Sequence, residues 1–96
     1  MPIPLNSAQK REMRSRAQKM DPTLRIGRAG LSEGWLRSME EELTQHQLVK
    51  IRFAELKEER KQLAPEIATR TGSELIALVG NVAVFYRAKA SPAVEA

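Results

Sequence analysis

Apolar residues recur along the chain at two spacings, one typical of helices and the other typical of strands. In residues 7–20, Met13, Ala17 and Met20 fall on one side of a helix that turns by about 100° per residue. The Asp21-Pro22 pair ends this pattern, because proline lacks the N–H group that a helix interior requires. The spacing therefore predicts an N-terminal helix that packs against the rest of the chain through one side.

Two further segments have helical spacing. The first follows Ser32, a good helix cap, and its stripe consists of Trp35, Leu36, Met39, Leu43 and His46. The second lies within residues 58–71 and is closed by Gly72, since glycine commonly caps the C-terminus of a helix. Pro65 either kinks this third helix or marks its true first turn.

Four shorter segments have the character of strands. Residues 23–26 form the first, and residues 48–54 place apolar side chains on one face and cationic side chains on the other. Residues 75–79 and 82–86 are apolar and flank Gly80-Asn81, a dipeptide suited to a two-residue hairpin turn. These patterns predict four strands, of which the last two pair with each other as a hairpin.

The predicted elements alternate in the order α-β-α-β-α-β-β, which indicates an α/β fold. We expect one compact domain over residues 1–90, with helices packed on a mixed four-stranded sheet. At least one strand pair should be parallel, and the last two strands should form an antiparallel hairpin. Residues 91–96 are expected to be a frayed tail.

The length of 96 residues fits this single domain and leaves no room for two cores. Hydrophobic residues make up 42% and charged residues 29%, as in an ordinary globular protein. The chain has no cysteine, which excludes disulfides and thiolate ligands and suits a reducing compartment. No apolar run approaches the 18 or so residues that cross a membrane, and the N-terminal residues lack the pattern of a secretory leader. The sequence therefore predicts a cytoplasmic protein that does not enter membranes.

Residue types that carry out catalysis or bind metals are scarce. His46 is the single histidine, and no spacing of histidine or carboxylate residues resembles a metal-ligand set. The three glutamates at 40–42 diverge by about 100° from one to the next on a helix, so they do not converge on one substrate atom. We predict no catalytic residue, no metal, no cofactor and no small-molecule substrate.

The net charge of +4 is unevenly placed. The first 31 residues contain seven basic and two acidic residues, whereas the remaining 65 contain nine basic and ten acidic ones. A basic third on a nearly neutral body is typical of a surface that faces a polyanion, although a solvated basic helix has the same composition. A DNA-reading helix-turn-helix is disfavoured, because the second predicted helix begins Ser-Glu-Gly-Trp and is acidic in its middle.

The sequence Gly27-Arg28-Ala29-Gly30 separates the first predicted strand from the second predicted helix, and we call it the GRAG turn. Glycine lacks the Cβ atom that would hold a phosphodiester away, and the helix that follows presents free N–H groups and a positive dipole end. KH modules clamp nucleic-acid backbone with a loop of this GXXG type. Because Arg25 and Arg28 add positive charge, the turn is predicted to hold phosphate.

Three segments together resemble a known family. They are LRIGRAGLSEGWL, HQLVKIRF and TRTGSELIALVGNVAVFYR, in this order and spacing. The chain is similar over residues 5–87 to the CRM (chloroplast RNA splicing and ribosome maturation) domain, and within that family to stand-alone bacterial proteins of YhbY type. The resemblance implies an RNA-binding α/β domain, similar to the C-terminal domain of translation initiation factor three, whose GXXG loop contacts RNA. It also implies a role in assembly of the large ribosomal subunit.

The leading hypothesis is a non-catalytic, monomeric RNA-binding protein that acts on precursor large-subunit ribosomal RNA. The predicted RNA-binding residues are Gly27, Arg28, Ala29, Gly30, Arg25, Lys10, Arg11 and Arg14. Lys50 and Arg52 are secondary candidates that can instead lie under a helix, and Trp35, Phe53 and Phe85 are assigned to the core. The alternative is a protein-interaction module that docks on a ribosomal protein or assembly factor. Salt separates the two, because binding through phosphates weakens steeply as salt rises.

Overall fold

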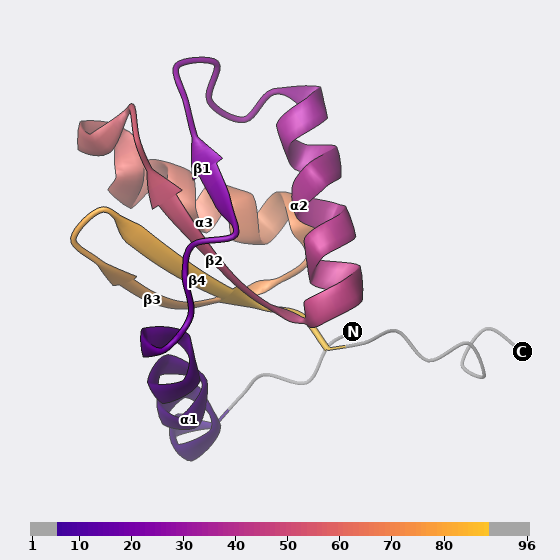
Figure 1. The fold of residues 1–96 in the computed structure, drawn as a ribbon, viewed down its shortest axis with the longest axis vertical. Helices are drawn as coiled ribbons and strands as arrows, with labels where there is room; N and C mark the ends of the chain where they lie inside the picture. The colour runs from indigo at the N-terminus through magenta and orange to yellow at the C-terminus, as the bar shows by residue number, and fades with distance from the viewer. Residues whose placement is uncertain (1–5, 89–96) are drawn as a thin grey trace, which may run out of the picture.

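The computed structural model describes residues 6–88, and its elements follow the predicted order (Figure 1). They are α1 (Ser7–Gln18), β1 (Leu24–Ile26), α2 (Glu33–His46), β2 (Leu48–Phe53), the 3₁₀ turn η1 (Lys57–Glu59), α3 (Arg60–Thr71), β3 (Glu74–Val79) and β4 (Val82–Tyr86). The sequence missed only η1. The predicted tail, residues 91–96, lies outside the described residues.

The four strands form one mixed sheet in the order β1-β2-β4-β3. Strands β1 and β2 are parallel, and the pairs β2–β4 and β3–β4 are antiparallel. The predicted parallel pair and terminal hairpin are therefore confirmed. Gly80 has φ +58, while Asn81 is not among the residues with positive φ. A positive φ at the first central residue alone fits a type II′ hairpin turn.

Helices α2 and α3 cover one face of the sheet, and α1 covers part of the other (Figure 1). Between the sheet and the helix pair lies the larger core, whose fully buried large side chains include Phe53, Phe85, Ile26, Met39 and Leu43. On the α1 side a smaller cluster contains Ala17, Leu48, Ile76 and Val84, with Met13 and Met20 packed against it. The stripe predicted for the first helix is thus the side that packs.

Strand β2 has buried side chains on both faces, which corrects the prediction of a single buried face. Val49, Ile51 and Phe53 face the larger core as expected. Lys50 lies under α1, where its ammonium group donates hydrogen bonds to the backbone oxygens of Ala17 (3.0 Å) and Met20 (2.9 Å). The Ala17 carbonyl lies in the last turn of α1 and the Met20 carbonyl lies just beyond it, where the negative end of the helix dipole favours a cation.

The third helix ends at the predicted residue, but it starts before Pro65, so one of the two predictions for this proline is wrong. Gly72 caps α3 with φ +63, and its N–H group donates to the oxygen of Ala68. Pro65 is not in the first turn, because α3 already begins at Arg60. The Lys61 carbonyl thereby loses the donor that any other residue at position 65 would supply.

Two properties of residues 6–88 bear on the class of function. No helix there is both long and apolar enough to span a membrane. Nor does this part of the chain bring together three or more carboxylate or histidine side chains that could hold a metal ion. His46 is exposed and lies 3.7 Å from the carboxylate of Glu42, one helical turn earlier.

Candidate nucleic-acid interface

The GRAG turn is a hydrogen-bonded β-turn. The Gly30 N–H group donates to the Gly27 oxygen at 3.1 Å, which puts Arg28 and Ala29 at the two central positions. Both central residues are exposed, and neither has a positive φ. The guanidinium of Arg28 therefore stands at the tip of a tight turn between β1 and α2, with its charge open to solvent.

The two glycines of the turn differ in their surroundings. Gly30 is buried and has φ +68, and a Cβ atom there would lie 3.3 Å from Leu56 Cδ1. Gly27 is exposed, and a Cβ atom there would meet nothing within 4 Å. Gly30 is needed for the backbone conformation and for packing on Leu56, so only Gly27 leaves open space beside the turn for another molecule's backbone.

Hydrogen bonds fix the base of the turn on both sides. The indole N–H of Trp35 donates to the backbone oxygen of Arg25 at 2.9 Å, which joins α2 to β1. The oxygen of Ile26 accepts from the N–H groups of Ala54 (3.1 Å) and Glu55 (3.0 Å). Sequence reasoning assigned Trp35 to packing alone, and it does pack against the larger core. Its polar edge also holds the turn in place, so the tip residues project from a fixed base.

Helix α2 begins directly after the turn. The Ser32 hydroxyl oxygen accepts from the Trp35 N–H group at 3.2 Å, and the Ser32 backbone oxygen accepts from Leu36 at 2.9 Å. The N–H groups of Glu33 and Gly34 therefore remain for an anion at this helix end. The Glu33 carboxylate, in the same first turn, stabilises the helix dipole but opposes a bound phosphate.

Arg25 and Arg52 lie side by side on the sheet. They are paired in the parallel register of β1 and β2, so their side chains leave the same face, and both are exposed. That face is the one covered by α1, because Lys50, two residues before Arg52, reaches α1 from it. Arg52, a secondary candidate in the sequence, thus stands next to the primary candidate Arg25, whereas Lys50 is turned into the protein.

The predicted cations of α1 lie far from the GRAG turn. The domain is 41 Å long, and Figure 1 shows the turn at one end of this axis and α1 at the other. Lys10 forms an ion pair with Glu74 of β3 at 3.1 Å, which ties its charge to the protein. Arg11 and Arg14 are exposed.

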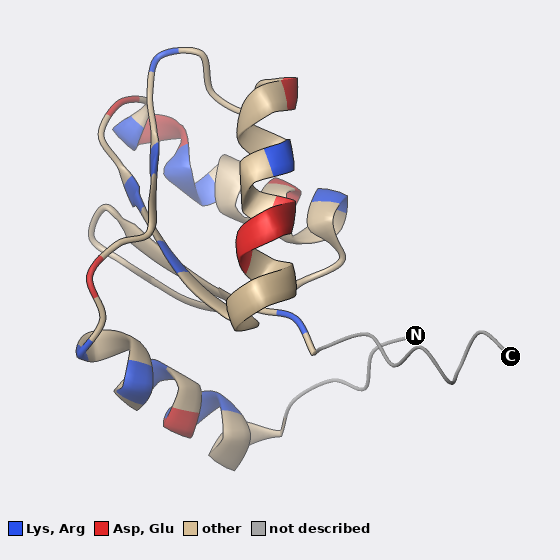
Figure 2. Cartoon of the chain, turned by 45° about the vertical axis from the view of Figure 1, so that its right-hand side comes forward, with Lys and Arg blue, Asp and Glu red and all other residues tan. Residues whose placement is uncertain are grey.

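The predicted site residues therefore form a row along the molecule rather than one cluster. Figure 2 shows basic positions at the turn, on β1 and β2, and along α1, while α2 carries acidic positions in its middle. We call five exposed residues the basic track: Arg28, Arg25, Arg52, Arg14 and Arg11. The basic track connects the GRAG turn with the basic residues of α1, and Arg25 and Arg52 of the sheet lie between them.

The chain matches the model of one protein family over residues 5–87, described as the CRS1 / YhbY (CRM) domain. A Pseudomonas aeruginosa protein named probable RNA-binding protein PA4753 is 30% identical, over 92% of this chain and 86% of the relative. A Haemophilus influenzae protein named RNA-binding protein is 32% identical, over 86% and 85%.

A solved structure is also similar. It is the solution structure of a hypothetical Staphylococcus aureus protein described as a candidate RNA-binding protein. The match has a TM-score of 0.78 and 30% identity, and covers 93% of this chain and 94% of the other. The fold, the matched span and these relatives agree with the resemblance carried by the three sequence segments. The chain belongs to the CRS1 / YhbY (CRM) domain family.

Proposed function

We propose that this protein binds RNA without catalysing a reaction, and that the RNA backbone follows the basic track from the GRAG turn to α1. The observation that carries the proposal is the arginine pair in register on β1 and β2. It places two exposed guanidinium groups between the turn and the helix, which are otherwise at opposite ends of the domain. The relatives named RNA-binding proteins support RNA as the polyanion.

At the turn, we expect one phosphate to approach the bare side of Gly27. Arg28 supplies the charge at the tip, and the free N–H groups at the start of α2 supply hydrogen-bond donors. Because the base of the turn is fixed by the Trp35–Arg25 hydrogen bond, little conformational entropy is lost when the phosphate binds. Further along, Arg25 and Arg52 can each neutralise a neighbouring phosphate.

Contacts of this kind fix the position of the RNA and do not read its sequence. We therefore expect recognition of RNA shape or of an unpaired region rather than of a short sequence. The family resemblance suggests the target: precursor large-subunit ribosomal RNA during ribosome assembly, bound by a monomer. Binding to a ribosomal protein or assembly factor is the competing function, because part of the sheet face beside α1 is apolar and open to solvent.

The target is tested with transcripts of precursor large-subunit and small-subunit ribosomal RNA, cut to fragments of equal length. We expect at least one large-subunit fragment to bind about tenfold more tightly than every small-subunit fragment at the same salt. Equal binding of both sets would contradict the large-subunit target and leave RNA binding intact. Binding that does not respond to salt would instead favour the protein-interaction function.

A further inference from the structure

One row of side chains crosses all four strands on the face that α1 only partly covers. The pairing register aligns Arg25 with Arg52, Arg52 with Val82, and Val82 with Val79. Residues opposite one another on neighbouring strands share a face, so two arginines and two valines stand in line. The next row, with Lys50, lies under α1. The first row lies beyond the helix.

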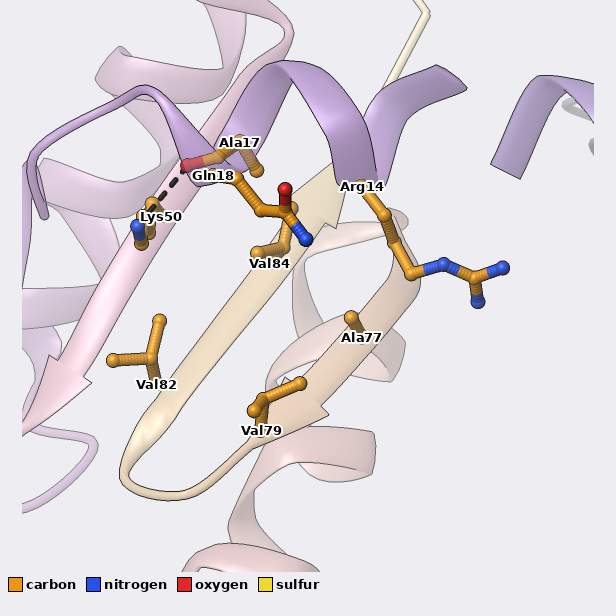
Figure 3. A pocket seen from close by; sticks show the side chains of 8 residues that line it. All are labelled: Arg14, Ala17, Gln18, Lys50, Ala77, Val79, Val82 and Val84. Carbon is orange, nitrogen blue, oxygen red and sulfur yellow. Dashed lines mark hydrogen bonds between the residues drawn. The ribbon is translucent and has the colours of Figure 1, made fainter. Parts of the chain in front are cut away.

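The valine end of this row is unusually open. Val79 is 72% exposed, the largest exposure of a large hydrophobic side chain within residues 6–88. Beside it is a hollow of about 300 Å³, and Figure 3 shows its apolar floor of Ala77, Val79, Val82 and Val84. A concave, mostly apolar surface with a few polar groups at its edge is the usual lining of a ligand-binding site.

The rim of the hollow is polar and cationic. Arg14 and Gln18 extend from α1 along one side, and the Lys50 ammonium is turned away toward the Ala17 oxygen (Figure 3). Arg52 stands next to Val82 on the opposite side, through the β2–β4 register. No carboxylate belongs to the residues that line the hollow. An apolar peptide would leave these guanidinium groups without partners, whereas an RNA strand carries phosphates on both sides of each base.

We propose that this hollow binds one unstacked nucleobase of the RNA, a proposal that rests on the proposed function. The flat face of a base fits the valine methyl groups, and its polar edge can pair with the Gln18 amide. Guanidinium planes also stack on bases, which suits Arg14 and Arg52 at the two rims. Because a duplex keeps its bases stacked and paired, the subsite selects for single-stranded RNA.

The test compares three probes of known composition: a twelve-nucleotide oligoadenylate, an abasic strand of equal length and charge, and the oligoadenylate–oligouridylate duplex. For the unaltered protein we expect binding to oligoadenylate about tenfold tighter than to the abasic strand, which is within the effect of one stacked base. The duplex offers no unstacked base, so its binding, like that of the abasic strand, should not depend on the hollow.

Two variants assign this preference to the hollow. Val79→Thr/Val82→Thr keeps side-chain size, strand propensity and charge but puts hydroxyl groups on the apolar floor, so it should lose most of the preference while binding the abasic strand as before. Val79→Tyr places an aromatic ring at an exposed position and should tighten binding to oligoadenylate alone. Circular dichroism checks that both variants fold.

Equal affinity of the unaltered protein for oligoadenylate and the abasic strand would overturn the subsite. So would a preference that survives the double threonine variant and does not change with Val79→Tyr. Arg28→Gln distinguishes this failure from failure of the proposed function, because it should weaken binding to all three probes. If it weakens none, the proposed function fails as well.

Discussion

Replacing each glycine of the GRAG turn by alanine distinguishes a glycine that the backbone conformation requires from a glycine that lets RNA approach. Gly30 has φ +68, and alanine in this left-handed region costs about 1–2 kcal/mol. The added Cβ would also lie 3.3 Å from Leu56 Cδ1, a side-chain end that can shift. Against this, replacing glycine by alanine reduces the entropy of the unfolded chain by about 0.4–1 kcal/mol. We expect Gly30→Ala to lower the free energy of unfolding by about 1 kcal/mol.

Gly27→Ala is the matched control for stability and the test for function. Its Cβ would meet nothing within 4 Å, and φ there is not in the left-handed region, so stability should stay equal or rise by about 0.5 kcal/mol. The same Cβ would stand where the phosphate is proposed to approach. We therefore expect Gly27→Ala to weaken RNA binding severalfold, and Gly30→Ala to weaken it less under conditions where both are folded.

Urea unfolding followed by the fluorescence of Trp35, the single tryptophan, measures both stabilities, and filter binding measures affinity. If Gly30→Ala is as stable as the unaltered protein, the backbone conformation at position 30 does not require glycine. If Gly27→Ala binds RNA with unchanged affinity, Gly27 is not the point of approach.

Three other substitutions, one of them with a matched control, test the account by urea unfolding followed by circular dichroism or by filter binding. Pro65→Ala should raise the free energy of unfolding by about 1 kcal/mol, because it restores a donor inside α3, and no change would refute this. Lys50→Met should lower the free energy of unfolding by about 1–2 kcal/mol through loss of the hydrogen bonds to the Ala17 and Met20 oxygens. Its control is Arg52→Met, which should change the free energy of unfolding by less than about 0.5 kcal/mol because Arg52 is exposed on the same face. Trp35→Phe keeps the packing but removes the bond to the Arg25 oxygen, so it should cost about 1 kcal/mol and weaken RNA binding; unchanged affinity would show that the turn needs no such support.

The order of the elements could be predicted from the sequence because each element carries its own apolar spacing, cap or turn residues. Met13, Ala17 and Met20 pack as a helical stripe, Gly72 caps α3, and Gly80 turns the hairpin. The start of α3 was harder, since η1 adds a turn of different geometry before Arg60. The alternation of apolar and polar residues along β2 also does not show how far α1 extends over that strand.

The site was predicted in its parts and not in its arrangement. The GRAG turn and the basic first helix are local features, so the sequence names them directly. The position of Arg25 beside Arg52, and of Val82 beside Val79, depends on the strand order and register, which join residues far apart in the chain. For the same reason Lys50 and Arg52 could not be separated, although one lies under α1 and the other faces solvent.

The measurement that tests the central claim most directly is RNA affinity as a function of salt. Five phosphate contacts along the basic track predict that the logarithm of the association constant falls with the logarithm of salt at a slope of about −3.5 for a single strand. Arg28→Gln and Arg52→Gln should each reduce this slope by about 0.7. Arg70→Gln is the control, because Arg70 lies on α3, across the sheet from α1, and pairs with Glu66 at 2.9 Å. A slope unchanged by the two track variants, or reduced equally by Arg70→Gln, would contradict the account.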